Sequence, residues 1–156
     1  MNYAQAVEFV LDEEGGIAYN VKDRGGLTNF GISQRQYPYL DIPNLTKEQA
    51  AKIYKHDYWD KIPDLPARLK FLVFDFAVNA GTSRAIKTLQ LAVSVNADGD
   101  IGPKTRAAIK QVGDDAVLVL FSAERARFYA GLDNFSSFGR GWMRRTMRAF
   151  YHAIQN

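Results

Sequence analysis

The sequence of 156 residues contains no cysteine and only two histidines, His56 and His152. Without cysteine there is no disulfide framework, no cysteine-ligated zinc site and no thiol nucleophile. The two histidines do not form a His-Glu-x-x-His motif, so neither a histidine metal site nor a histidine-based triad is indicated. We therefore expect no metal and no cofactor. Carboxylates are the main candidates for chemistry.

Long apolar runs are also missing from the sequence. The longest, residues 116–121, is far shorter than the roughly 20 residues needed to cross a bilayer. The first residues lack the basic start and apolar stretch of a secretory signal. These absences predict no transmembrane segment, and they predict synthesis in the cytoplasm.

Charge is distributed unevenly along an otherwise ordinary globular composition of 47% apolar and 24% charged residues. Residues 1–100 carry 11 Lys and Arg against 13 Asp and Glu, whereas residues 101–156 carry 9 against 4. A basic C-terminal part favours an anionic partner such as nucleic acid, a membrane surface or an acidic wall polymer. A solvated basic surface explains the same charges without any partner.

Apolar residues recur every three or four positions over most of the chain, which predicts a mainly helical protein. Asn2, Thr46 and Asp114 are the expected N-caps of three of the helices, and Thr82 or Ser83 that of a fourth. The glycine-rich residues 20–33 predict tight turns with at most a short hairpin. The expected helices cover residues 3–14, 47–58, 66–80, 82–93, 103–112, 114–132 and 141–154.

Glu14 ends the first expected helix, directly before Gly15 and Gly16. The C-terminus of a helix carries roughly half a negative charge, and Asp12 and Glu13 add like charges. Both effects disfavour an ionised Glu14, as a general acid requires. The two glycines let the backbone turn sharply and leave the carboxyl group uncovered.

The second glycine pair, Gly25 and Gly26, predicts a turn that brings Asp23 back toward Glu14, with Thr28 beside it. Two carboxyl groups flanking one bond is the arrangement used in glycoside hydrolysis, where one donates a proton and the other activates water or stabilises positive charge. A threonine hydroxyl would hold that water. Spacing alone also fits a helix end followed by ordinary glycine turns, and this alternative stays open at this point.

These motifs resemble the signature of family 108 of the glycoside hydrolases, which are phage-type lysozymes (N-acetylmuramidases). The resemblance rests on Glu14-Gly15-Gly16 followed by Asp23-x-Gly25-Gly26-x-Thr28-x-x-Gly31-Ile32, and the Glu-x8-Asp-x4-Thr spacing is similar to the triad of the broader phage lysozyme group. It continues through Tyr58-Trp59, residues 74–81, residues 98–105 and Gly141-Trp142, which follow the pattern of the family and of its predicted peptidoglycan-binding region. The family resemblance implies that Glu14 is catalytic, and the triad adds Asp23 and Thr28.

The resemblance implies a lysozyme-like, mainly α fold in one compact domain of two lobes. Residues 1–88 would form the catalytic lobe, and residues 89–156 a helical, peptidoglycan-binding-like lobe packed on it. The implied reaction is hydrolysis of the β-1,4 bond between N-acetylmuramic acid and N-acetylglucosamine in bacterial peptidoglycan. Glu14 would be the general acid and Asp23 the second carboxylate, while Thr28 would place the water.

Other functions fit parts of the sequence. A lytic transglycosylase needs only one acid, and a wall-binding or secretion-associated protein would keep the fold without cutting glycan. The hypothesis of a nucleic-acid binder is supported only by the basic charge of the C-terminal part. We therefore expect peptidoglycan, and no nucleic acid, as the partner. The basic lobe would also bind anionic envelope polymers. We expect a monomeric endolysin that reaches the wall through a separately encoded, holin-type membrane pore.

Five further residues are candidates for sugar contacts. Tyr19, Asn20 and Asn29 lie in the glycine-rich loop, where amides and phenols would bond sugar hydroxyls or acetamido groups. Trp59 would offer a flat apolar face, and Asn79 would face the cleft. Each also has a structural interpretation: turn residue, core aromatic or helix cap.

Two sets of charged or aromatic residues have uses that the sequence leaves open. Asp75 lies in a strongly apolar helix and must therefore be paired, hydrogen-bonded or protonated, which favours a structural role. Trp142 with Arg140, Arg144 and Arg145 would hold wall polymer or anionic lipid, or would simply be core and solvated rim.

Overall fold

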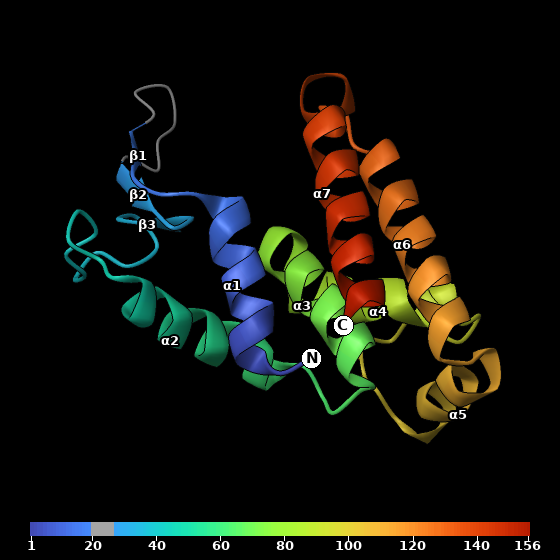
Figure 1. Ribbon diagram of the computed structural model, residues 1–156. Helices are drawn as coiled ribbons and strands as arrows, with labels where there is room; N and C mark the ends of the chain where they lie inside the picture. The colour runs from blue at the N-terminus through green and yellow to red at the C-terminus, as the bar shows by residue number, and fades with distance from the viewer. Residues whose placement is uncertain (20–26) are drawn as a thin grey trace.

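The computed structural model describes residues 1–19 and 27–156. Within these ranges the chain forms seven α-helices, one 3-10 helix and three short strands, so the mainly helical prediction is confirmed (Figure 1). In chain order the elements are α1 (Tyr3–Glu14), β1 (Ala18–Tyr19), β2 (Leu27–Asn29), β3 (Ile32–Ser33), α2 (Lys47–Asp57), η1 (Trp59–Lys61), α3 (Ala67–Ala80), α4 (Thr82–Ala92), α5 (Pro103–Val112), α6 (Asp114–Ala130) and α7 (Phe135–Gln155).

Helix α3 is the centre of the fold. Its aromatic residues Phe71, Phe74 and Phe76 are completely buried, and the helix packs against α1, α4, α6 and α7. Figure 1 shows α3 between the α1–α2 side of the molecule and the antiparallel pair α6–α7. The buried apolar residues form one continuous cluster, so both expected lobes share a core.

Two of the expected helix caps are confirmed by reciprocal hydrogen bonds. Asn2 forms a capping box with Gln5, and Thr46 forms one with Gln49. The expected caps of α4 and α6 are wrong, because Thr82 and Asp114 are the first helical residues. The residues Gly81 (φ 85°) and Gly113 (φ 89°) each end one helix and begin the next, since glycine adopts positive φ without steric cost.

Helix α7 begins at Phe135 rather than at the expected Gly141. Glycines at positions 139 and 141 lower intrinsic helix propensity, which is why the sequence suggested a later start. A Cβ atom at Gly139 would lie only 2.5 Å from the Phe135 ring, so this glycine lets the ring pack on its own helix. None of the helices in the described part of the chain is long and apolar enough to cross a membrane.

The strands form an antiparallel sheet in the order β1-β2-β3, one strand more than the expected hairpin. Ala18 pairs with Thr28, and Asn29 pairs with Ile32. The buried Asn29 donates from Nδ2 to the carbonyl oxygens of Ile42 (3.1 Å) and Leu45 (3.3 Å). These bonds anchor the sheet to the loop before α2, and the sheet lies beyond the C-terminal end of α1 (Figure 1).

Candidate active site

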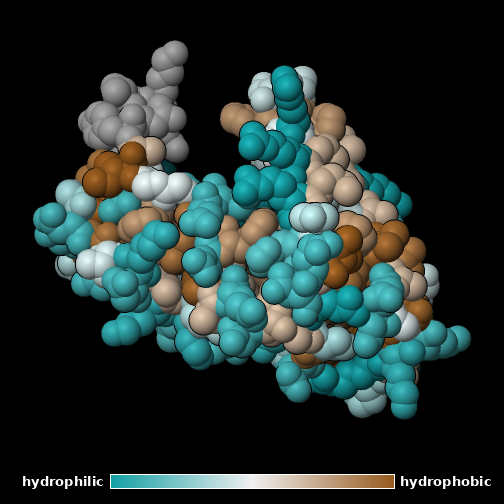
Figure 2. Space-filling view, viewed as in Figure 1, coloured by the Kyte–Doolittle hydropathy of each residue, from teal (hydrophilic) through white to brown (hydrophobic). Residues whose placement is uncertain are grey.

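Glu14 is the last residue of α1, as the sequence predicts. The N–H of Gly15 (φ 73°) donates to the carbonyl oxygen of Leu11 (3.1 Å) and closes the helix there. The Glu14 side chain keeps 21% of its surface exposed. Figure 2 shows the molecular surface hollowed between the sheet and the upper part of α7, where this end of α1 lies.

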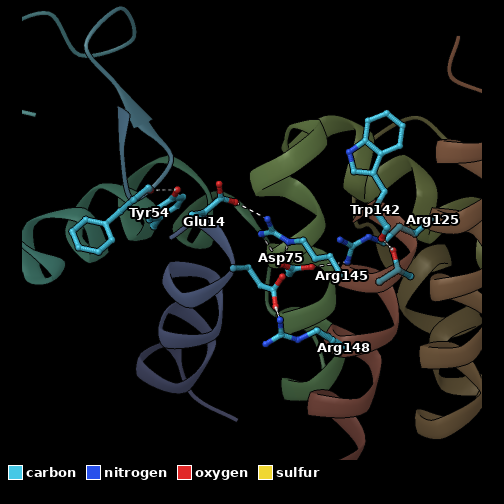
Figure 3. A network of polar contacts seen from close by, with 10 residues as sticks. Glu14, Tyr54, Asp75, Arg125, Trp142, Arg145 and Arg148 are labelled. Atoms are coloured by element: carbon cyan, nitrogen blue, oxygen red, sulfur yellow. Dashed lines mark hydrogen bonds and ion pairs between the residues drawn. The ribbon is translucent and has the colours of Figure 1, made fainter. Parts of the chain in front are cut away.

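Arg145 of α7 binds Glu14 and Asp75 with one guanidinium group (Figure 3). Its Nη1 donates to Glu14 Oε1 (2.6 Å), its Nε donates to Asp75 Oδ1 (2.9 Å), and its Nη2 lies 2.8 Å from the same oxygen. Only 11% of the Arg145 side chain is exposed. The expectation of a solvated arginine at this position is therefore wrong. Arg145 ties α7 to α1 and α3.

Asp75 is completely buried, and its second oxygen accepts a hydrogen bond from Arg125 Nη1 of α6 (2.6 Å). Burial alone would raise the pKa of Asp75, but the guanidinium groups of Arg125 and Arg145 outweigh it and hold that pKa below its ordinary value. Burial likewise opposes the charge of Arg145, yet Asp75 and Glu14 raise its pKa further. The buried groups of this cluster thus stay ionised, and the expected structural role of Asp75 takes the form of a double ion pair.

The electrostatic setting of Glu14 differs from the one that the sequence suggested. The helix end and its acidic neighbours are present, but Arg145 adds a positive charge in direct contact with the carboxylate. The charge of Glu13 is also compensated, since its Oε1 lies 2.8 Å from Arg148 Nη1. Within the described residues, no three His, Asp or Glu side chains are grouped to hold a metal ion.

A two-residue turn between β2 and β3 covers Glu14 from the other side. Phe30 (φ 50°) and Gly31 (φ 72°) both have positive φ, the pattern of a type I′ hairpin turn. A Cβ atom at Gly31 would lie 2.6 Å from Glu14 Oε2 and 2.8 Å from the hydroxyl oxygen of Tyr54. Only glycine therefore allows the turn to approach the carboxylate so closely.

Tyr54 of α2 holds this turn in place. Its hydroxyl donates to the carbonyl oxygen of Phe30 (2.8 Å), and its ring is buried. Burial raises the pKa of Tyr54, and the neighbouring Glu14 carboxylate raises it further. The hydroxyl thus keeps its proton, and with it the hydrogen bond that fixes the turn.

Thr28 lies in the middle of β2, and its hydroxyl donates to the carbonyl oxygen of Ala18 (3.1 Å). Because successive strand residues point to opposite faces, Thr28 faces away from the buried side that Asn29 occupies. The amide nitrogen of Asn29 is used inside the protein, so we replace its predicted sugar contact with a structural role.

Part of the predicted site lies in residues 20–26. Asn20 and Asp23 are outside the described residues, and so is the side chain of Tyr19, whose main chain belongs to β1. The sugar contacts predicted for Tyr19 and Asn20, and the second-carboxylate role of Asp23, stay predictions.

Trp59 lies at the opposite end of α1 from Glu14, and its predicted sugar contact stays a prediction. Its ring packs against Tyr3 (5.3 Å between centroids) and Phe74 (5.4 Å), and Lys70 Nζ lies 4.8 Å from its centre. Tyr3 begins α1 and Glu14 ends it, so the helix separates them by about 16 Å. Trp59 is a core aromatic at the opposite end of α1.

Asn79 is exposed in the last turn of α3, beside Arg145. Hydrogen bonding assigns its amide oxygen to Arg145, at 3.0 Å from Nη1 and 3.2 Å from Nη2. Its amide nitrogen points away from the guanidinium group. Asn79 therefore borders the Glu14–Arg145 pair, where the sequence predicted a substrate contact.

The turn formed by residues 98–100 is tied to the protein by the buried side chain of Gln90. Gln90 of α4 is 1% exposed, and its Nε2 donates to Asp98 Oδ1 (2.7 Å) and to the carbonyl oxygen of Asp100 (2.9 Å). Its Oε1 accepts from the N–H of Gly99 (2.8 Å). These hydrogen bonds stabilise the turn, while the side chains of Asp98 and Asp100 stay exposed.

The roles of Arg145, Arg125, Gly31 and Tyr54 were not predicted from the sequence. One signal was readable: Arg125 stands one turn after Phe121 and one turn before Tyr129, on an apolar helix face. A charge on such a face needs an opposite charge, and Asp75 was the buried carboxylate without a known partner. Nothing in the sequence pointed to the contact between Gly31 and Glu14.

Comparison with known proteins identifies the family of the chain. Residues 7–81 match the profile described as "Glycosyl hydrolase 108", and residues 84–147 match "Predicted Peptidoglycan domain". A solved structure of SagA from Brucella abortus is 36% identical, with a TM-score of 0.85, and the alignment covers 98% of this chain and 94% of that chain. No curated protein matches the sequence.

The two profile matches divide the chain at a slightly different place from the one we expected. They meet between residues 81 and 84, where α4 begins, whereas the expected boundary lay between residues 88 and 89. Together with the SagA likeness, which extends over nearly the whole chain, they show that this protein belongs to the glycosyl hydrolase 108 family and carries that family's C-terminal peptidoglycan domain.

Proposed function

We propose that the protein hydrolyses the β-1,4 bond between N-acetylmuramic acid and N-acetylglucosamine in bacterial peptidoglycan, with Glu14 as the general acid. The observation that carries this proposal is the asymmetric setting of the Glu14 carboxyl group. Oε1 is held by Arg145, whereas Oε2 faces the turn at Gly31 and has no hydrogen bond within the described residues. One oxygen is thus positioned by the protein, and the other keeps a free hydrogen-bonding capacity, which we assign to the substrate.

The chemistry follows from these contacts. Glu14 donates its proton to the glycosidic oxygen as the bond to the sugar ring breaks, which leaves a carboxylate on Glu14. The guanidinium group of Arg145 stabilises that carboxylate from 2.6 Å. Asp75 fixes the guanidinium group from behind, so Arg145 keeps its position when the charge of Glu14 changes.

Asp23 and Thr28 complete the proposed mechanism. We assign Asp23 as the second carboxylate, which activates water or stabilises the oxocarbenium-like sugar. The Thr28 hydroxyl donates to Ala18, so its oxygen lone pairs are left to accept a hydrogen bond from the water. A lytic transglycosylase is the competing reaction, because it needs the same acid but uses a sugar hydroxyl in place of water.

The test is the Glu14→Gln variant, which keeps the size and shape of the side chain but has no proton to donate. We expect the variant to fold normally and to lose the ability to lower the turbidity of purified peptidoglycan. Lysis at the parent rate would exclude Glu14 as the acid. Mass spectrometry of the parent products decides between the reactions, because only a transglycosylase leaves anhydro-muramic ends.

Two further parts of the proposal concern where the enzyme works. We propose that the exposed arginines of α7 bind anionic envelope polymers, an attraction that added salt would screen. We also propose that the protein reaches the wall through a separately encoded membrane pore. Sedimentation with purified wall polymer at low and high salt tests the first part. A pore-forming membrane protein encoded nearby would support the second.

A further inference from the structure

Phe138 is an exposed aromatic residue that the core nevertheless holds in place. Near the start of α7, it keeps 57% of its surface exposed. Its ring lies 5.8 Å from the ring of Trp142, which in turn stacks on Tyr129 of α6 (4.9 Å between centroids, 15° between planes). Tyr129 is buried, so three rings in succession connect the core to the surface.

The exposed ring lies on the same side of α7 as the proposed catalytic site. Phe138 precedes Arg145 by two helical turns, which places both residues on one face, about 10 Å apart along the axis. Arg145 contacts Glu14 directly. Figure 3 shows Trp142 and Arg145 on neighbouring turns, with Arg145 extended toward Glu14.

Between Glu14 and Phe138 the described residues offer an exposed amide and a glycine. Asn79 lies exposed against Arg145, with its amide nitrogen turned away from the guanidinium group. Gly141, one turn before Arg145, has no side chain, and a Cβ atom there would meet nothing within 4 Å. A chain of linked sugars lying along α7 would meet an amide, a bare stretch of backbone and then an aromatic ring.

The charges of α7 also suit a peptidoglycan strand, whose peptide stems carry carboxylates. Helix α7 contains Arg140, Arg144, Arg145 and Arg148 and no acidic residue. The region matching the peptidoglycan domain includes both Phe138 and Trp142. The turn at residues 98–100 in that region is satisfied by Gln90, so it offers fewer groups to a ligand than α7 does.

We infer that Phe138, supported by Trp142, is the stacking platform of a sugar-binding subsite for the glycan strand of peptidoglycan, continuous with the Glu14 site. This inference rests on the proposed function and gives the C-terminal region its contact with the substrate. The flat ring packs against the apolar face of a sugar and removes both surfaces from water. The glycan strand then runs from Phe138 along α7 to the bond at Glu14.

Binding is measured with the Glu14→Gln variant as the parent, so that no glycan is cut during the experiment. Sedimentation with purified peptidoglycan gives the bound fraction at increasing polymer concentration. Phe138→Ala is expected to raise the dissociation constant about tenfold, and Phe138→Trp to keep it near the parent value. The matched control is Met147→Ala, which removes an apolar side chain with 60% exposure from the same helix, next to the α6–α7 groove.

Each result supports or overturns the subsite. Weakened binding in Phe138→Ala with parent-like binding in Met147→Ala supports it, whereas parent-like binding in both variants overturns it. Equal weakening in both variants also overturns it, because that result indicates unspecific apolar adhesion.

Turnover is measured separately with Glu14 intact, where Phe138→Ala should raise KM and leave kcat near the parent value. If no variant cuts glycan, the proposed function fails while the binding result still stands.

Discussion

The Glu14 carboxylate and the Arg145 guanidinium group lie 2.6 Å apart, although 131 residues separate them in the sequence. Glu14 belongs to the region that matches the glycosyl hydrolase profile, and Arg145 belongs to the region that matches the peptidoglycan domain. The two regions therefore build one site together. In the proposed mechanism the C-terminal region therefore also supplies Arg145, the group that positions Glu14.

Replacing Gly31 by alanine should remove most of the activity. The new Cβ atom would meet Glu14 Oε2 at 2.6 Å, so the turn or the carboxyl group must move. Alanine at positive φ also destabilises the fold, by about 1–3 kcal/mol. The control is Gly113→Ala, which is also strained at positive φ (89°) but has open space around the new atom. Thermal unfolding should show a loss for both variants, whereas peptidoglycan hydrolysis by the folded protein should fall only in Gly31→Ala.

Arg145→Lys tests whether the guanidinium group positions Glu14. Lysine keeps the charge, but a single ammonium group cannot reproduce the contacts to both Glu14 and Asp75. We expect kcat to fall about a hundredfold, the effect of a displacement of roughly 1 Å, with KM little changed. The neighbouring Arg144→Lys is exposed and should behave like the parent enzyme. A parent-like kcat in Arg145→Lys would show that charge alone is sufficient.

Asp75 should make stability depend on pH in the acid range. Its pKa is lower in the folded than in the unfolded protein, so its stabilisation is complete above about pH 4 and is lost as the pH falls toward the folded value. Asp75→Asn should cost about 3–5 kcal/mol at neutral pH, because Arg125 loses its buried partner.

Urea unfolding of parent and Asp75→Asn at pH 7 and pH 3 measures this difference. The stability gap between the two proteins should narrow at pH 3, where the parent loses the contribution of the ionised Asp75. Asp12→Asn is the control. The Asp12 side chain is 61% exposed, and its Oδ1 lies 3.6 Å from Lys47 Nζ. A surface ion pair of this kind contributes less than about 1 kcal/mol to the free energy of unfolding. A gap that stays constant with pH would contradict the assignment of the ionised group to Asp75.

Gln90→Leu tests the structural role of the turn at residues 98–100. The substitution removes hydrogen bonds to Asp98, Gly99 and Asp100 and should lower the free energy of unfolding by about 2–3 kcal/mol. Gln111→Leu, at an exposed position, should have little effect. The folded fraction of Gln90→Leu should bind peptidoglycan as the parent does. Weaker binding by fully folded protein would show that the turn takes part in binding peptidoglycan.

For α1 and α2 the sequence was sufficient, because the deciding interactions there are local. The apolar period of residues 3–14, the cap at Asn2 and the glycines after Glu14 placed the carboxyl group at a helix end, because each of these signals acts within one or two turns. The same holds for the capping box at Thr46. The sequence left Trp59 open between core and cleft, since a partly buried tryptophan has the same local sequence in both places.

The amino-acid sequence alone determined a mainly helical protein, with Glu14 at the end of its first helix and a glycine-rich turn after it. Tertiary structure decided which groups surround that carboxyl group: Arg145, with Asp75 and Arg125 behind it, and the turn at Gly31 above it. The reason is physical. Periodicity and caps act between residues close in sequence, whereas these ion pairs join residues 50 to 131 positions apart, and only the packing of α1, α3, α6 and α7 brings them together.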